Sequence, residues 1–506
     1  MTPWTCATNG PAACCAPRRG HRCTSPMNIG TLIDAAAAGD PARTALIIDG
    51  RAIGYGELGE AVRRCAAALA ANGVGVTDRV AVVDAGSVLS IATVLAAARI
   101  GAAAALMNPA LTAPELRGLM ANGRCGAVAV AGDAYVGRVR DAGARTVLTE
   151  ADLVNTADVN VPPVADDDAR TALLLFTSGT TGLPKAVDIA SRQLTMRIGR
   201  MSLPFHAGTT PTIGMMCVPF FHIGGAIGLL GSLYSGNTVV VQKRFDAGEW
   251  LRLVSQHRVT GMFLVPTMLQ RILDHPDFAA TDLSSLAAIA YGAAAAPMAL
   301  VHRAMAALPN VAFANVFGQT ETLGAYTTLL PDEHRDPARA GSVGRPLPGV
   351  EVRVVDPETG IDVATGAVGE LWVNTSQNAV AGWVHTGDLG RRDADGYIYP
   401  VGRMRDTINR GGEKFGPIEV EEAVGSHPAV ADVAVAGIAD EEMGQRVGAA
   451  VVAREPVTLE ELREHCRERI AYFKLPERLA LVDQIPYSAT GKVSREQVAA
   501  LITGVG

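Results

Sequence analysis

Residues 173–185 read LLLFTSGTTGLPK, an apolar run that passes directly into hydroxylated residues, glycines and a lysine. Glycines let a backbone approach an anion closely, hydroxyls donate hydrogen bonds to phosphate oxygens, and lysine supplies a mobile positive charge. The pattern predicts a strand followed by a polyphosphate-binding loop containing Thr177, Ser178, Gly179, Thr180, Thr181, Gly182 and Lys185. A Walker loop is excluded because Leu183 and Pro184 precede the lysine. The alternative for so short a motif is a polar surface turn.

Four further motifs follow this loop along the chain. They read GQTET at residues 318–322, HTGD at 385–388, GRMRD at 402–406 and TGK at 490–492. In this order, the loop and these motifs resemble the adenylate-forming (AMP-binding) superfamily. The text around residues 408–422 resembles its acyl-CoA synthetase, or fatty-acid–CoA ligase, branch. Five ordered matches favour this resemblance over an isolated surface turn.

The composition is that of a large folded protein. The chain has 506 residues, and a single hydrophobic core stops growing near about 250 to 300 residues, so we expect two or more domains. Hydrophobic residues make up 48% of the chain, which argues against disorder. The net charge of -7, without a long basic block, gives no support for nucleic-acid binding.

Two apolar windows, residues 88–106 and 223–241, have the length of a membrane span. Charged, glycine and polar residues interrupt them, so each predicts a buried helix followed by a strand, and no transmembrane segment is expected. Cysteines scattered singly through the globular part predict reduced thiols and a cytoplasmic protein. Residues 1–26 hold the other four cysteines, and we predict that they form a disordered extension or precede the true start at Met27.

The remaining sequence alternates apolar helices with short Val/Ala strands, which is typical of largely parallel α/β sheets. The pattern predicts a helix at 55–72 and strands at 79–83, 126–130, 215–219, 238–241, 261–265 and 287–291. Period-two stretches at 350–355 and 369–373 predict a β-rich module, and helices are expected at 417–426 and 459–469.

We therefore predict an α/β fold with two domains. Residues 27–402 form a large N-terminal adenylation domain, made of two αβ sheet subdomains and a β-rich subdomain. Residues 403–506 form a small α+β C-terminal domain, and the resemblance implies that this domain is mobile and has its hinge at Arg405.

Activating a carboxylic acid with ATP brings a carboxylate to an anionic α-phosphate, so positive groups and a metal ion have to reduce the repulsion. The resemblance implies that Glu321 binds Mg²⁺, which prefers oxygen ligands, and that Thr320 contacts the α-phosphate. Taken alone, Glu321 would be a surface carboxylate on a turn. The adenine is expected in an apolar slot formed by Phe317, where the family usually has tyrosine, and by Gly318, Gly292, Ala293 and Ala294.

The resemblance assigns the ribose to Asp388 and Arg403. We expect Asp388 to follow a turn that exposes its carboxylate to two ribose hydroxyls, with Arg403 as a second ribose or phosphate contact. Without the family frame, Asp388 would be a turn or cap residue, because Gly-Asp is common in turns.

Lys492 matches the family's catalytic lysine, which together with Lys185 neutralises charge between the two anions. Gly411 and Gly412 match the wall of a tunnel for the thiol arm of coenzyme A, reached after the C-terminal domain rotates. A plain hairpin is the alternative for this glycine pair.

The acid is expected beside His222, Gly224, Gly292 and Leu323, in a pocket whose apolar walls favour a fatty or other hydrophobic acid. A buried structural histidine is the alternative for His222. Ile223 departs from the His-Asn pair of the family's aryl-acid activators. Residues 374–382 fill an interval where the family has a longer segment, so a surface element near the nucleotide is expected to be shortened.

Together these features predict an acyl-CoA synthetase, AMP-forming, that uses ATP, Mg²⁺ and coenzyme A. It would convert the acid to acyl-AMP with release of pyrophosphate and then to the thioester. Two alternatives stay open: an acyl-AMP ligase that loads an acyl carrier protein, and a nucleotide-binding protein that has lost catalysis.

Overall fold

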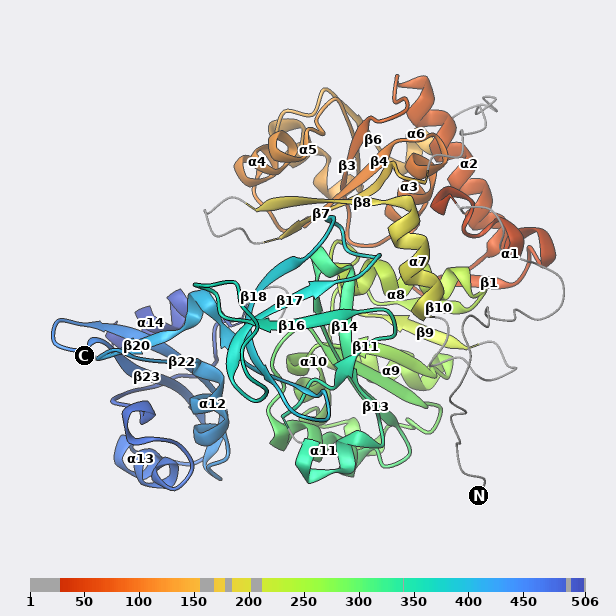
Figure 1. The fold of residues 1–506 in the computed structure, drawn as a ribbon. Coiled ribbons are helices and arrows are strands. Elements are labelled where there is room, and N and C mark those ends of the chain that lie inside the picture. Colours follow the sequence, from red (N-terminus) through yellow and green to blue (C-terminus); the bar gives the residue numbers. More distant parts are fainter. Residues whose placement is uncertain are drawn as a thin grey trace, which may run out of the picture.

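The computed structural model describes residues 28–154, 168–177, 184–201, 212–339, 341–487 and 493–504. A large N-terminal part and a smaller C-terminal part lie side by side (Figure 1). Four sheets organise the described chain, and they correspond to the predicted two αβ subdomains, β-rich subdomain and C-terminal domain. The predicted extension, residues 1–26, lies outside the described residues.

The first sheet is formed by sequence between residues 79 and 190 and has the order β6-β5-β3-β4-β7-β8. All neighbouring strands are parallel except β7 and β8, which form an antiparallel pair. Alternating side chains pack against helices on both faces, which is the pattern of a fully covered sheet. The strands are β3 (Arg79–Val83), β4 (Ala103–Met107), β5 (Val128–Ala131), β6 (Thr146–Leu148), β7 (Thr171–Thr177) and β8 (Lys185–Ala190). The helices nearby are α2 (Tyr55–Ala71), α3 (Val88–Arg99), α4 (Ala113–Gly123), α5 (Val136–Asp141) and α6 (Glu150–Val154).

The second sheet has nine strands in the order β15-β14-β13-β12-β11-β9-β10-β1-β2. Its last two strands come from the beginning of the chain, because β1 pairs in parallel with β10, with Leu46 opposite Val239. The strands are β1 (Thr44–Ile48), β2 (Arg51–Gly54), β9 (Ile213–Met216), β10 (Thr238–Val241), β11 (Gly261–Leu264), β12 (Ala288–Gly292), β13 (Ala312–Gln319), β14 (Gly324–Leu329) and β15 (Arg345–Pro346). The helices are α1 (Asp34–Gly39), α7 (Ser191–Met201), α8 (Ile223–Tyr234), α9 (Ala247–His257), α10 (Pro266–Leu273) and α11 (Met298–Ala307).

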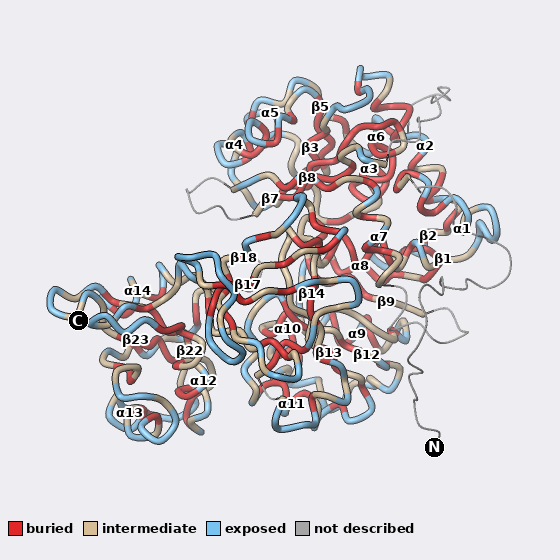
Figure 2. The backbone as a smooth tube through the Cα atoms, in the orientation of Figure 1, coloured by how far each residue is buried: buried red, intermediate tan, exposed pale blue. Residues whose placement is uncertain are grey.

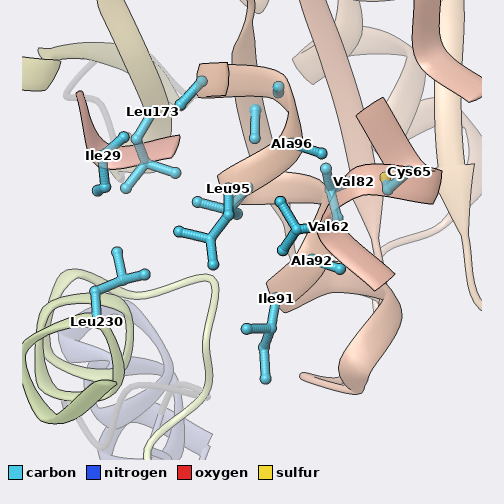
Figure 3. Close-up of a cluster of buried hydrophobic side chains, with 14 of the residues drawn as sticks. Ile29, Val62, Cys65, Val82, Ile91, Ala92, Leu95, Ala96, Leu173 and Leu230 are labelled. Atoms are coloured by element: carbon cyan, nitrogen blue, oxygen red, sulfur yellow. The ribbon is translucent and has the colours of Figure 1, made fainter. Parts of the chain in front are cut away.

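One hydrophobic cluster joins these two sheets. It contains Leu173 of β7, Leu95 of α3 and Leu230 of α8, together with Ile29 from the start of the described chain. Figure 3 shows Leu230 opposite Ile29 and Leu95, so helices that follow strands of different sheets share one core. Burying such side chains contributes about 1.5–3 kcal/mol each, and the shared cluster therefore fixes the two sheets relative to each other.

The β-rich sheet and the C-terminal part complete the chain. The third sheet is an antiparallel meander of β16 (Glu351–Val355), β17 (Val368–Asn374), β18 (Val384–Arg392) and β19 (Ile398–Arg403). The C-terminal sheet contains β20 (Ile408–Arg410), β21 (Glu413–Phe415), β22 (Val430–Asp440), β23 (Gly444–Ala453) and β24 (Arg478–Leu481). Its helices are α12 (Pro417–Gly425), α13 (Leu459–Arg467) and α14 (Arg495–Gly504). Buried residues concentrate in the strands, whereas the outer turns of α4, α5 and α13 are exposed (Figure 2).

The two apolar windows fold as predicted, each as a buried helix that leads into a strand: α3 into β4, and α8 into β10. None of the helices in the described part of the chain combines the length and apolar character that crossing a membrane requires. Cys65, Cys125, Cys217 and Cys466 are free and buried, and burial raises the pKa of the Cys466 thiol to about 11.

Two buried tyrosines differ in how their hydroxyls are satisfied. The Tyr55 hydroxyl donates to the carbonyl oxygen of Asn237 at 2.7 Å and lies 3.1 Å from that of Leu233, so it connects α2 to the end of α8. The Tyr326 hydroxyl of β14 is fully buried and has no hydrogen-bond partner among the described residues.

We expect Tyr55→Phe to lower the free energy of unfolding by about 1 to 3 kcal/mol, because it removes the hydroxyl that donates to the buried carbonyl oxygen of Asn237. Tyr326→Phe removes a hydroxyl that makes no bond and is expected to be neutral or stabilising. Urea unfolding followed by tryptophan fluorescence checks both variants. An equal loss of stability in the two would contradict this assignment of the hydrogen bonds.

Candidate active site

A cavity of about 1560 Å³ lies where the ends of the first two sheets meet the C-terminal part. Most of its wall is apolar, and charged side chains also line it. The predicted site residues on its wall are Thr177, His222, Gly224, Ala293, Gly318, Thr320, Glu321, Leu323, Arg403 and Arg405. Lys185, Gly292, Ala294, Phe317, Asp388, Gly411 and Gly412 are described but do not line it.

The end of β7 brings the predicted phosphate loop to the predicted metal ligand. The Thr177 hydroxyl donates to Glu321 Oε1 at 3.3 Å, across a long separation in the sequence. Lys185 begins β8 directly opposite Thr177 in the antiparallel pair, and its side chain is exposed. The loop residues Ser178, Gly179, Thr180, Thr181 and Gly182 lie outside the described residues.

A short 3-10 turn, Thr320–Thr322, holds Glu321 in place. The Thr322 hydroxyl donates to the carbonyl oxygen of Gly324 at 2.7 Å, and the backbone N–H of Gln319 donates to the Thr322 hydroxyl at 3.1 Å. Leu323 closes the turn in the left-handed conformation, with φ 52°, and its side chain is fully buried. The hydrogen bonds and the buried anchor therefore fix the direction in which Thr320 and Glu321 face the cavity.

The shortened interval at residues 374–382 packs against this turn. The Ala379 N–H donates to the Glu321 carbonyl oxygen at 2.8 Å, and the side-chain amide of Gln377 donates to the Thr322 carbonyl oxygen at 3.4 Å. Gln377 and Asn378 are buried. The expectation of a surface element is therefore wrong for these two residues. Gln377 satisfies the backbone of the turn, and the Asn378 amide donates to the carbonyl oxygens of Val373 and Gly382.

The residues predicted to hold adenine differ in whether they line the cavity. Ala293 is on its wall and has φ 68°, a conformation that residues other than glycine rarely adopt. Gly292 faces the neighbouring strand so closely that a Cβ there would lie 2.0 Å from the Val316 carbonyl oxygen, so glycine is required for packing. The Phe317 ring contacts Tyr326 edge-on, with 5.3 Å between centroids. The adenine slot stays a prediction.

Asp388 differs from the expected exposed turn residue. It lies within β18, is buried, and forms an ion pair with Arg403 of β19, with 2.9 Å between Asp388 Oδ1 and Arg403 Nε. The two residues are directly opposite each other in the antiparallel register, which explains why they meet. Burial, and next the Asp388 carboxylate, raise the pKa of Tyr326 well above its usual value. The predicted ribose contact is thus part of a buried charged pair.

Segments of the C-terminal part also reach the cavity. Val493 and Ser494, which directly follow Lys492 in the sequence, line it. Lys492 itself lies outside the described residues. Gly411 and Gly412 form the two-residue turn between β20 and β21, with φ values of 59° and 96°, so this pair has the geometry of a hairpin in the described structure.

The residues predicted to contact the acid have largely apolar neighbours on the cavity wall. His222 and Gly224 at the start of α8 line the cavity together with Leu323. A Cβ at Gly224 would come within 3.1 Å of the Phe263 ring, so the absent side chain keeps this part of the wall thin. Two arginines of α7, Arg197 and Arg200, also line the cavity, and the sequence analysis did not identify them. The signal was present, since Arg197 falls on the same helical face as Leu194 and Ile198.

Glu321 suits a magnesium ion that is bound together with a nucleotide. Among the described residues no group of three or more His, Cys, Asp or Glu side chains could hold a metal by itself. Mg²⁺ is commonly bound by one or two carboxylates and by substrate phosphates, and Glu321 lies against Thr177 at the edge of the phosphate loop. The donor set therefore fits a metal that enters with its nucleotide.

A sequence profile described as AMP-binding enzyme matches residues 33–381, and a second, described as AMP-binding enzyme C-terminal domain, matches residues 419–492. The chain belongs to the AMP-binding enzyme family. The predicted boundary between residues 402 and 403 falls between the two matches, and its position stays a prediction.

Relatives in this family cover nearly the whole chain. An indoleacetate–CoA ligase of Aromatoleum aromaticum is 32% identical, over 94% of this chain and 98% of its own. A fatty acid–[acyl-carrier-protein] ligase of Streptomyces coeruleorubidus is 30% identical, over 91% and 93%. The solved structure of o-succinylbenzoate coenzyme A synthetase of Bacillus subtilis, in complex with ATP and magnesium ion, has a TM-score of 0.82 at 28% identity and covers 92% of this chain and 99% of its own. This AMP-binding enzyme is an acid–thiol ligase of the adenylate-forming type, as predicted.

The Asp388–Arg403 pair has unequal access to water: the Asp388 side chain is 8% exposed and that of Arg403 is 32% exposed. We expect Arg403→Met to lower the free energy of unfolding more than Asp388→Asn does, because it removes the counter-charge of a carboxylate that water barely reaches. Removing one partner of a buried pair costs about 3–5 kcal/mol. In Asp388→Asn the cost is smaller, because the partly exposed Arg403 side chain can turn to solvent. Chemical denaturation of the two variants measures the difference, and the reverse order would contradict it.

Proposed function

We propose that this enzyme is an ATP-dependent acyl-CoA ligase with a single site for both half-reactions. The observation that carries the proposal is that one cavity is lined by Thr177, Thr320 and Glu321 and also by Val493, the residue directly after Lys492. We infer from the position of Val493 that Lys492 acts in the same cavity as Thr177 and the predicted metal ligand Glu321. ATP, Mg²⁺ and coenzyme A as co-substrate agree with the family membership and with the complex of the solved relative.

In the first half-reaction a carboxylate oxygen of the acid attacks the α-phosphorus of ATP, and pyrophosphate leaves with the electron pair of the broken P–O bond. Lys492 and Lys185 are proposed to offset the negative charge of the two reactants, while Thr320 donates a hydrogen bond to the α-phosphate. Mg²⁺ at Glu321, when bound, neutralises phosphate charge. Asp388 and Arg403 would hold the ribose, and Phe317 with Gly292, Ala293 and Ala294 the adenine.

In the second half-reaction the coenzyme A thiolate attacks the carbonyl carbon of the acyl-AMP, AMP leaves, and the thioester forms. For this step the C-terminal domain is proposed to rotate about Arg405, which removes Lys492 and brings Gly411 and Gly412 to the thiol arm. Gly411 and Gly412 do not line the cavity in the described structure, so the proposed rotation would have to bring them to it.

The acid is proposed to have a hydrophobic body, because Phe221, Ile223, Phe263, Val265 and Met268 form much of the wall. The alternative acceptor is an acyl carrier protein, which the named activity of one relative favours. A cytoplasmic location stays a prediction from the cysteine pattern.

Exchange of labelled pyrophosphate into ATP, over a panel of fatty and aryl carboxylic acids, tests adenylation. We expect exchange with at least one hydrophobic acid, and release of free AMP with thioester formation when coenzyme A is added. Exchange without thioester would favour the carrier-protein ligase, and the same assay with a phosphopantetheinylated carrier protein would then give product. No exchange with any acid would favour a nucleotide-binding protein that has lost catalysis.

We expect Lys492→Ala to lower the adenylation rate by a factor on the order of 10² to 10³, because a positioned donor to the developing charge is lost. Formation of thioester from supplied acyl-AMP and coenzyme A should be largely intact. Lys243→Ala is the control, since this lysine pairs with Asp49 and does not line the cavity. Equal losses in both half-reactions would contradict the rotation of the C-terminal domain.

A further inference from the structure

Arg197 is a buried cation on the wall of the cavity. It lies on α7, is 8% exposed, and its Nε has no hydrogen-bond partner among the described residues. No described carboxylate forms an ion pair with it. Burial, and next the charge of Arg200, lower its pKa to about 10, so the guanidinium is still protonated at neutral pH. Positive charge is thus held in the wall without a counter-charge from the described protein.

The neighbouring arginine shows the contrast. Arg200, one helical turn further along, lies 3.1 Å from Gln377 Oε1 and 3.5 Å from Thr375 Oγ1, so its donors have protein acceptors. The positive charge of Arg200 repels that of Arg197 and does not neutralise it. A buried charge without a partner is among the most costly features of a protein, and such groups gather where a ligand supplies the opposite charge.

Arg197 lies beside Gly324, the residue after the predicted acid contact Leu323. A Cβ at Gly324 would lie 3.8 Å from Arg197 Nη2, so the missing side chain at Gly324 leaves room in front of the guanidinium. The turn before Leu323 carries the predicted metal ligand Glu321, which contacts Thr177 at the edge of the predicted phosphate loop. Arg197 itself has no contact with Glu321 or Thr177 among the hydrogen bonds and ion pairs of the described residues.

We propose that the physiological substrate is an acid with an apolar body and a second carboxylate, which binds the guanidinium of Arg197. Arginine presents parallel N–H donors that match both oxygens of a carboxylate, and a charge-assisted pair in a dry cavity is strong. The inference rests on the proposed ligase function and narrows its substrate class from hydrophobic acids in general to dicarboxylic acids.

The test compares acids of equal length in pyrophosphate exchange: octanoate with octanedioate, dodecanoate with dodecanedioate, and phenylacetate with carboxyphenylacetate. In the native enzyme at least one diacid should have a higher kcat/KM than its matched monoacid. Arg197→Met should lower the ratio of kcat/KM for that diacid over its monoacid by about tenfold to a hundredfold, the range for a hydrogen bond to a charged group. Arg197→Lys, which keeps the charge, should retain part of the ratio.

The control is Arg192→Met, since this arginine lies on the same helix, is exposed and does not line the cavity, and its ratio should equal that of the native enzyme. Monoacids preferred over every diacid by the native enzyme would overturn the inference while supporting the ligase function. An unchanged ratio in Arg197→Met would also overturn it, because an arginine that held the reacting carboxylate or a phosphate would affect both acids alike. Absence of exchange with every acid would instead overturn the proposed function. The comparison of diacids with monoacids in the native enzyme tests the inference even if the Arg197→Met variant does not fold.

Discussion

The active-site geometry depends on a buried leucine. Leu323 follows the turn that carries Thr320 and Glu321, and it packs into the same hydrophobic cluster as Leu173 and Leu175 of β7. The strand that leads into the phosphate loop and the turn that presents the acidic side chain are therefore anchored in one core. Because close-packed interiors resist deformation, the two halves of the site hold their spacing without a direct ion pair between them.

The charged side chains around the cavity differ in the protein groups that they contact. Arg403 is neutralised by buried Asp388, and Arg200 is held by neutral acceptors, whereas Arg197 has no acidic partner among the described residues. An arginine that is already paired with a carboxylate can position a ligand, but the pair adds little net charge to the site. A cation without a protein counter-charge instead favours anions over neutral ligands, so the proposed selectivity for the acid depends on α7.

Local pattern was enough to predict most of the strands and helices, because apolar periodicity and short Val/Ala runs follow directly from burial. Features that depend on pairing between segments distant in the sequence could not be predicted from the local pattern. Asp388 was expected in an exposed turn, and only the register of β18 with β19 shows that Arg403 lies opposite and buries it. Arg197 was overlooked because a single arginine in a helix carries no motif, although its place on the apolar face was visible. The packing of Gln377 against the Glu321 turn likewise depends on tertiary contacts.

Strand β1 belongs to the second sheet, but in the sequence it precedes every strand of the first sheet. During translation β1 emerges with only β2 to pair with, and its other edge stays open until β10 has left the ribosome. Closing so long a loop is slow, and an open strand edge invites association with other chains. The pairing of β1 in the second sheet is therefore coupled to synthesis of the segment through Val241.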